Sequence, residues 1–136
     1  MLSATQMLFL NSVYIANILV AGFVGITALF FPEFSARYVL EGVSAAVPPY
    51  TSLRIVGSLW SAITVLSVLG LWVSPETYSV VLLLQLLYKG SWLLVVALPA
   101  MLRGQGHTLP MGMTWFFLAW VLILPWVIPY KFLGLL

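Results

Sequence analysis

The sequence predicts an all-α integral membrane protein, a bundle of four transmembrane helices that form one domain over residues 1–136. Of these residues, 63% are hydrophobic and only 6% are charged, whereas a soluble domain carries about 25% charged residues. Four apolar runs come near the roughly 20 residues that a helix needs to cross a bilayer. Turn-forming residues separate the runs. The predicted helices span residues 8–31, 52–73, 78–102 and 111–129.

The first predicted helix, 8–31, is longer than the apolar core of about 7–15 residues that a cleavable signal peptide carries. We therefore expect it to be retained in the protein. Asn17 lies near the middle of this helix. An amide at membrane depth is usually hydrogen-bonded to a neighbouring helix, and we expect this role for Asn17.

A short interfacial helix is predicted after Pro32, because proline ends the first helix and is also a favourable first residue of the next. Glu33, Arg37 and Glu41 are spaced four residues apart, so that one face carries alternating charges. Gly42 is a suitable residue to end this helix. A solvated charged face and a lid over a cavity are both compatible with this pattern.

The second predicted helix, 52–73, contains two pairs of small residues at a spacing of four. Gly57 pairs with Ser61, and Ser58 pairs with Ala62. Small residues allow helix backbones to approach closely in lipid. We therefore expect this face to pack against another helix.

The third predicted helix, 78–102, carries a lysine near its middle, Lys89. An ionisable group at this depth costs about 3 kcal/mol on insertion scales, and it usually faces protein or water. We expect the ammonium to point into the bundle, near Gln85 and Asn17, with a cation–π contact to Trp92. A glutamate, a water-filled cavity, a bound ligand or loss of the proton could each stabilise it.

Polar side chains at similar depth predict a pocket with one positive charge. Such a pocket suits a quinone carbonyl, a lipid headgroup or an anion. The alternative is a structural lysine, paired with Glu33 or Glu41 or bonded to Asn17 and carbonyl groups. The predicted pocket residues are Asn17, Ser61, Thr64, Gln85, Tyr88, Lys89 and Trp92.

The fourth predicted helix, 111–129, contains three tryptophans, Trp115, Trp120 and Trp126. Tryptophans are enriched where helices meet the membrane–water interface. We interpret these three as part of such an interfacial belt, which requires no ligand.

The distribution of basic residues predicts the orientation in the membrane. With four spans, the loops after the first and third helices share one side, and they contain Arg37, Arg54 and Arg103. The other side holds both termini and Lys131. The positive-inside rule then places both termini outside the cell.

The residue inventory excludes several kinds of chemistry. Cysteine and aspartate are absent, and the chain has three glutamates and one histidine, His107. Thiol catalysis, iron–sulfur clusters and cysteine-ligated zinc are therefore excluded. We expect no protein-ligated metal, and the absence of recognisable catalytic motifs favours a protein that is not an enzyme. The few basic residues form no cluster that would bind nucleic acid.

The segment Phe31-Pro32-Glu33, followed by a short polar stretch and then Leu53-Arg-Ile-Val-Gly-Ser-Leu-Trp60, resembles the DoxX-like group of small four-helix membrane proteins. This resemblance covers the end of the first helix and the start of the second. It implies a four-helix bundle in the bacterial inner membrane and, in some members, an association with quinone-linked redox enzymes. It implies no catalytic residue at any position of this chain.

Two functions fit these observations. The first and preferred is a non-catalytic accessory or structural subunit of a larger membrane complex, in contact with lipid and with other subunits or copies of itself. The second is a redox-associated membrane protein that binds quinone, lipid or an anion around Lys89.

Overall fold

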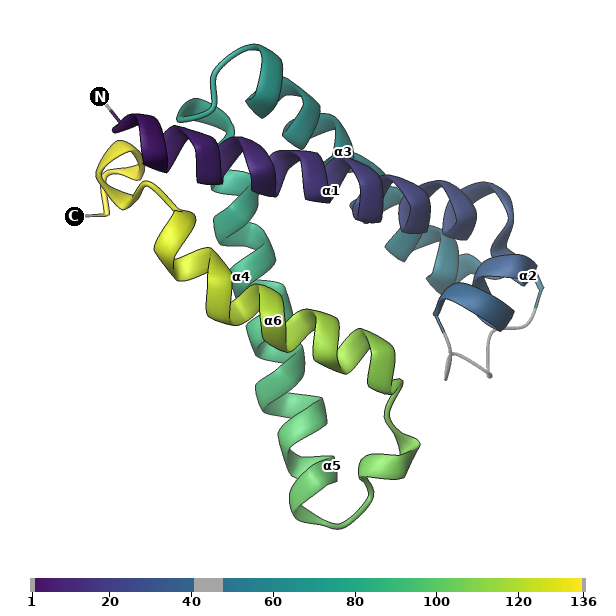
Figure 1. The fold of residues 1–136 in the computed structure, drawn as a ribbon. Coiled ribbons are helices and arrows are strands. Elements are labelled where there is room, and N and C mark those ends of the chain that lie inside the picture. The colour runs from purple at the N-terminus through teal and green to yellow at the C-terminus, as the bar shows by residue number, and fades with distance from the viewer. Residues whose placement is uncertain (1, 41–47, 136) are drawn as a thin grey trace. The chain divides into compact units, whose positions relative to one another are not determined.

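The computed structural model describes residues 2–40 and 48–135, and within these ranges the regular structure is entirely helical. Figure 1 shows the course of the chain. The elements are α1 (Ala4–Phe30), α2 (Pro32–Phe34), η1 (Ser35–Val39), α3 (Thr51–Trp72), η2 (Thr77–Ser79), α4 (Val80–Trp92), η3 (Leu93–Ala97), α5 (Leu98–Leu102), η4 (Gly106–Thr108), α6 (Met111–Val127) and η5 (Tyr130–Leu133).

The helices group into two compact units. The first comprises Met1–Val81 together with Pro129–Leu136, and the second comprises Leu82–Ile128. In the first unit the C-terminal turn η5 returns to contact η2. The prediction of a single domain over 1–136 stays a prediction.

Within the described residues, three helical segments are long and apolar enough to cross a membrane, namely Ala4–Phe30, Thr51–Trp72 and Thr77–Leu102. The chain is therefore an integral membrane protein, and these bounds lie close to those predicted. The first helix begins four residues earlier than expected because Ser3 caps it, with Gln6 completing a capping box. The fourth segment, α6, has 17 residues, and its role as a fourth span stays a prediction.

The segment after Pro32 is helical, as expected, and continues to Val39. Proline stands at its first position, where its missing N–H costs nothing. The predicted charge ladder ends with Glu41 and the predicted C-cap is Gly42, and both lie outside the described residues. That this helix lies in the membrane interface stays a prediction.

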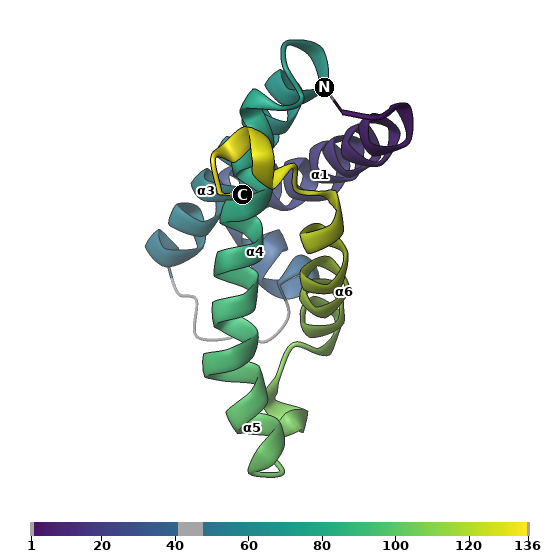
Figure 2. The same ribbon diagram turned by 90° about the vertical axis from the view of Figure 1, so that its left-hand side faces the viewer.

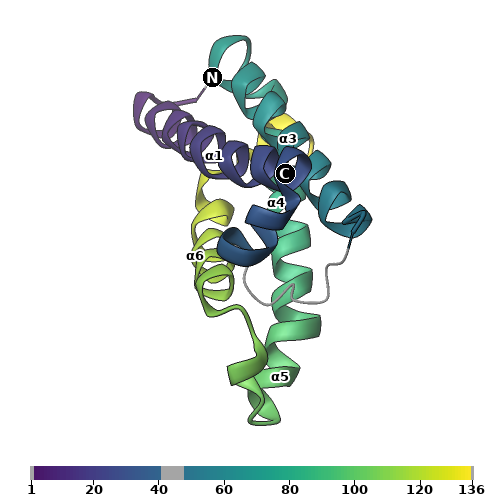
Figure 3. The ribbon, with the colours of Figure 1, turned by 90° about the vertical axis from the view of Figure 1, so that its right-hand side faces the viewer.

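In the first unit, α1 and α3 pack side by side and antiparallel, as Figure 3 shows. Glycines bring the two backbones together. A Cβ atom built on Gly57 would lie 2.7 Å from the backbone nitrogen of Leu29, and one built on Gly25 would lie 2.8 Å from that of Ser61. The structure thus confirms that the face bearing Gly57 and Ser61 meets another helix.

The second predicted pair of small residues does not take part in this contact. Ser58 and Ala62 are both exposed, and the Ser58 hydroxyl donates to the carbonyl oxygen of Arg54 in its own helix. Neighbouring positions on a helix are about 100° apart, so a face centred on Gly57 excludes the residue that follows it. The prediction was wrong for this pair.

A tyrosine fixes the other end of the α1–α3 pair. The fully buried ring of Tyr14 fills the space beside Gly70, where a built Cβ would lie 2.5 Å from a ring carbon. Its hydroxyl donates a 2.6 Å hydrogen bond to the carbonyl oxygen of Pro75, in the turn after α3. Small residues on α3 thus accommodate α1 at both ends.

In the second unit, α4, η3 and α5 form one continuous helical run that turns back into α6, as Figure 2 shows. The run widens into a π-helix at Leu93–Ala97, just before Pro99. A proline inside a regular helix removes a hydrogen bond and clashes with the carbonyl group four residues before it. The wider turn relieves this conflict and lets the helix continue to Leu102.

We expect Gly57→Ala to lower the free energy of unfolding by about 1–3 kcal/mol, because the added methyl group would overlap the α1 backbone. Gly90→Ala is the matched control, since nothing lies within 4 Å of a Cβ built there. Unfolding in mixed detergent micelles, followed by circular dichroism, measures both. Equal effects of the two substitutions would contradict close packing at Gly57.

Candidate ligand site around Lys89

Lys89 and Gln85 lie one helical turn apart on α4, and each side chain is only 1% exposed. The Lys89 ammonium donates a hydrogen bond to the Gln85 side-chain oxygen. The spacing of four residues places both on one face of the helix, so the pairing follows directly from the sequence.

A second donor reaches the same oxygen from α6. The indole N–H of Trp120 donates a hydrogen bond to the Gln85 oxygen over 3.0 Å. An amide oxygen has two lone pairs, and here Lys89 and Trp120 occupy both. This assigns the orientation of the Gln85 amide, with its nitrogen directed away from both donors.

Among the described residues of the second unit, aromatic rings from α4 and α6 lie around the Lys89 ammonium. All of them are within the range of about 6 Å over which a ring attracts a cation. The Lys89 nitrogen lies 4.8, 5.5, 5.6 and 5.8 Å from the ring centroids of Tyr88, Phe117, Phe116 and Trp120, respectively.

Two buried polar atoms near the Lys89 ammonium have no hydrogen-bond partner within the described part of the chain. They are the amide nitrogen of Gln85 and the hydroxyl of Tyr88. A buried polar group without a partner costs about 1–3 kcal/mol. Such groups are rare in native proteins and often mark the place of a ligand or water.

The cluster is therefore rich in hydrogen-bond donors. Lys89 contributes an ammonium, Gln85 contributes an amide N–H₂, and Tyr88 contributes a hydroxyl. The sequence of residues 82–128 contains no aspartate or glutamate, so the donors of this unit are not matched by a carboxylate of the same unit. The complementary ligand atom is a carbonyl or anionic oxygen.

The other predicted pocket residues on the first unit have hydrogen-bond partners there. The Asn17 amide donates to the Ser67 hydroxyl over 3.3 Å, which confirms its expected bond to a neighbouring helix. Ser61 and Thr64 donate to the carbonyl oxygens of their own helix four residues earlier. That these three residues share a pocket with Lys89 stays a prediction.

The cation–π contact expected between Lys89 and Trp92 stays a prediction. Trp92 packs edge-on against Phe117, with ring centroids 5.5 Å apart, and Phe117 is one of the rings around Lys89. Trp92 therefore supports the cluster indirectly.

Sequence reasoning missed the contribution of α6. Trp120 was assigned to the interfacial belt, yet it lies in the middle of α6 and bonds to Gln85. Phe116 and Phe117 precede it by about one turn, and Phe116 stacks on Trp120 with centroids 5.1 Å apart. Aromatic residues in the middle of an apolar helix, away from both of its ends, are the signal that would have revealed them.

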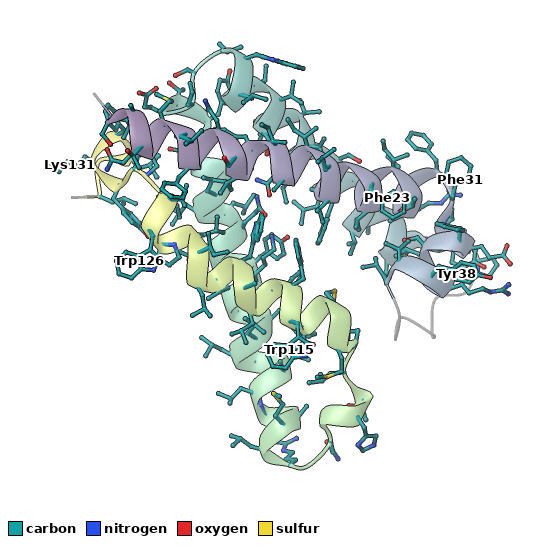
Figure 4. All side chains as sticks on the ribbon, in the orientation of Figure 1. Phe23, Phe31, Tyr38, Trp115, Trp126 and Lys131 are labelled. Atoms are coloured by element: carbon teal, nitrogen blue, oxygen red, sulfur yellow. The ribbon has the colours of Figure 1, made fainter. Side chains whose placement is uncertain are left out.

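The other two tryptophans of α6 are exposed, and their place in an interfacial belt stays a prediction. Trp115 and Trp126 are exposed and project from the helix in Figure 4. His107 is exposed in the loop before α6. Within the described residues no group of three histidine, cysteine, aspartate or glutamate side chains could hold a metal ion.

No protein-family model matches the chain, and no curated protein and no solved structure is significantly similar to it. The resemblance to the DoxX-like group therefore stays a prediction.

We expect Tyr88→Phe to raise the free energy of unfolding by about 1 kcal/mol in the absence of added ligand, because it removes a buried hydroxyl without a partner. Tyr14→Phe is the matched control. It removes the hydrogen bond to Pro75 and should lower the free energy of unfolding by about 1 kcal/mol. A loss of stability in Tyr88→Phe equal to that in Tyr14→Phe would show that the Tyr88 hydroxyl is structurally engaged.

Proposed function

We propose that this integral membrane protein binds a small amphiphile through a carbonyl or anionic oxygen held by Lys89, Gln85 and Tyr88. The observation that carries the proposal is the pair of buried donors, on Gln85 and Tyr88, that lie beside the lysine without a hydrogen-bond partner in the described chain. A ligand oxygen would satisfy them. A quinone carbonyl, a lipid headgroup and a small anion all present such an oxygen.

The aromatic rings around Lys89 fit this proposal. Rings such as those of Tyr88 and Trp120 stabilise the ammonium through their faces. The lysine can therefore be buried beside the ligand oxygen that the Gln85 and Tyr88 donors would bind. A planar ligand such as a quinone would also stack favourably in an aromatic environment.

The same residues support a binding role without catalysis. Proton transfer usually needs a histidine or a carboxylate near the ligand, and residues 82–128 supply only the exposed His107. Any chemical conversion of the ligand would then take place in another protein. This agrees with an accessory subunit of a larger membrane complex. We propose that the ligand is used by the other subunits of that complex.

We further propose that α6 is a fourth span and that the protein lies in a bacterial inner membrane, as the resemblance to DoxX-like proteins implies. Helix α6 has 17 residues, a length of about 26 Å at 1.5 Å per residue. This is at the short end of the range of about 17–25 residues observed for spanning helices. Loops one and three would then face the cytoplasm, with both termini outside.

We expect Lys89→Met to weaken ligand binding about tenfold or more, because a hydrogen bond to a charged group contributes about 1.5–3 kcal/mol. Its free energy of unfolding should equal or exceed that of the parent. Quenching of tryptophan fluorescence by a short-chain benzoquinone measures binding to a carbonyl ligand, and titration with oleate measures binding to an anionic one.

Lys131→Met is the control, since it removes the other lysine, which is exposed. If neither probe binds the parent saturably, the proposal is wrong. A loss of about 3–5 kcal/mol of stability in Lys89→Met would instead identify a structural ion pair.

The four-span proposal predicts that Ser3→Cys and Leu135→Cys are labelled from the same side of the membrane. The parent has no cysteine, so each variant carries a single reactive thiol. An impermeant maleimide added to intact cells should label both, and Arg103→Cys should be labelled only after the cells are opened. Labelling of Ser3→Cys and Leu135→Cys from opposite sides would refute an even number of spans.

A further inference from the structure

A second site lies in the first unit, where the end of α1 meets the start of α3. A cavity of about 520 Å³ opens there, within the range typical of small-molecule sites. Two arginines, Arg37 and Arg54, line it together. The remaining lining residues are Phe30, Phe31, Pro32, Glu33, Phe34, Tyr38 and Tyr50.

The packing of α1 on α3 explains why these residues meet. Gly57 lies against Ala28 and Leu29, so the residue one turn before it, Arg54, stands beside the end of α1. Pro32 then turns the chain into α2 and η1, which carry Arg37 to the same place. Two cations that are 17 positions apart in the sequence thus share one cavity.

The charges in the cavity favour an anion. Among the described residues of the lining, two arginines, Arg37 and Arg54, stand against one carboxylate, Glu33. A hydrogen bond from Arg37 to Tyr38, aided by the charge of Glu33, raises the pKa of the Arg37 guanidinium. Guanidinium groups match phosphate because their planar N–H donors can bond two oxygens at once.

The rest of the lining is aromatic and is suited to the membrane interface. Phe34 packs against Tyr38 with centroids 5.3 Å apart, and the Arg37 guanidinium lies 5.9 Å from the centroid of the Tyr38 ring. Phe31 and Tyr38 project from this end of the unit in Figure 4, and both are exposed. Aromatic and basic residues at the end of a spanning helix are those that contact lipid headgroups and the upper acyl chains.

A further feature lies at Tyr50, which precedes α3 with φ of 58°. Non-glycine residues rarely adopt this left-handed conformation. In this conformation Tyr50 lines the cavity together with Arg54. A second cavity, of about 550 Å³, shares Tyr50 and Arg54 and continues along α3 past Ile55 and Ser58.

We infer that Arg37 and Arg54 bind the phosphate of an anionic membrane phospholipid, whose acyl chains contact the adjoining phenylalanines. The lipid source is favoured over free phosphate because the aromatic lining and the ends of two spanning segments meet at the cavity. The lining of this site contains none of the residues of the Lys89 cluster, and its test does not depend on the proposed function.

Native mass spectrometry of the full chain in detergent, titrated with phosphatidylglycerol, tests the inference. A basic residue near a membrane contributes about 1 kcal/mol to the binding of anionic lipid, or about fivefold in affinity. Arg37→Gln and Arg54→Gln should each weaken binding about fivefold, and the double variant about 25-fold. Glu33→Gln should strengthen it, because a negative charge beside the phosphate is removed.

Arg103→Gln is the matched control, with the same change of charge on an exposed arginine of the other unit, and it should bind like the parent. The double variant Arg37→Lys, Arg54→Lys keeps the charge but loses the planar donors, and it should bind with intermediate affinity. Circular dichroism should show equal helical content in all variants.

Three results would overturn the inference. The first is phosphatidylglycerol binding that is unchanged in the double glutamine variant. The second is equal weakening by Arg103→Gln, which would indicate attraction by net charge alone. The third is binding of inorganic phosphate as tight as that of phosphatidylglycerol, which would show that the lipid is not the ligand.

Discussion

The side-chain oxygen of Gln85 determines the chemistry of the second unit. It accepts hydrogen bonds from Lys89 on its own helix and from Trp120 on α6, and so it joins the two helices at the position where burial is most costly. Because both of its lone pairs are used, the amide nitrogen must point elsewhere, and it remains a donor without a partner in the described chain. This one oxygen thus holds the Lys89 side chain in place and links α6 to α4. The amide N–H₂ of Gln85 and the hydroxyl of Tyr88 are left as donors without a partner in the described chain.

Much of the architecture could be predicted from the sequence because lipid imposes simple rules. Long apolar runs gave the spanning helices, and the small residue Gly57 gave the contact between α1 and α3. A hydrogen bond from Asn17 to a neighbouring helix was predicted, but its partner, Ser67, was not. The rotation of each helix about its axis decides which side chain Asn17 meets. The pairing of Lys89 with Gln85 followed from their spacing. The role of Trp120 did not, because contacts between helices far apart in sequence depend on crossing geometry that composition does not encode.

The two candidate sites use different cations, whose chemistry suits different ligands. Lysine carries a compact charge on a flexible stem, and at Lys89 it is held by an amide and by aromatic faces. Arginine carries a broad, planar and weakly hydrated charge, and Arg37 and Arg54 stand beside the end of α1 and the start of α3, two helices long enough to cross a membrane. A ligand with one exposed oxygen fits the first arrangement. A tetrahedral group with several equivalent oxygens fits the second.

The π-helical turn at Leu93–Ala97 also has a consequence for how this sequence can change. A π turn holds about one residue more than an α turn, so every position after it is rotated by about 100° relative to an uninterrupted helix. Lys89 stands before this turn, and Arg103 stands after it. Loss of one residue from the π turn itself would restore a regular helix and leave the following loop on the same side of the axis, because the wide turn already absorbs one residue in excess. Loss of one residue from a regular part of the run would instead rotate the following loop by about 100°.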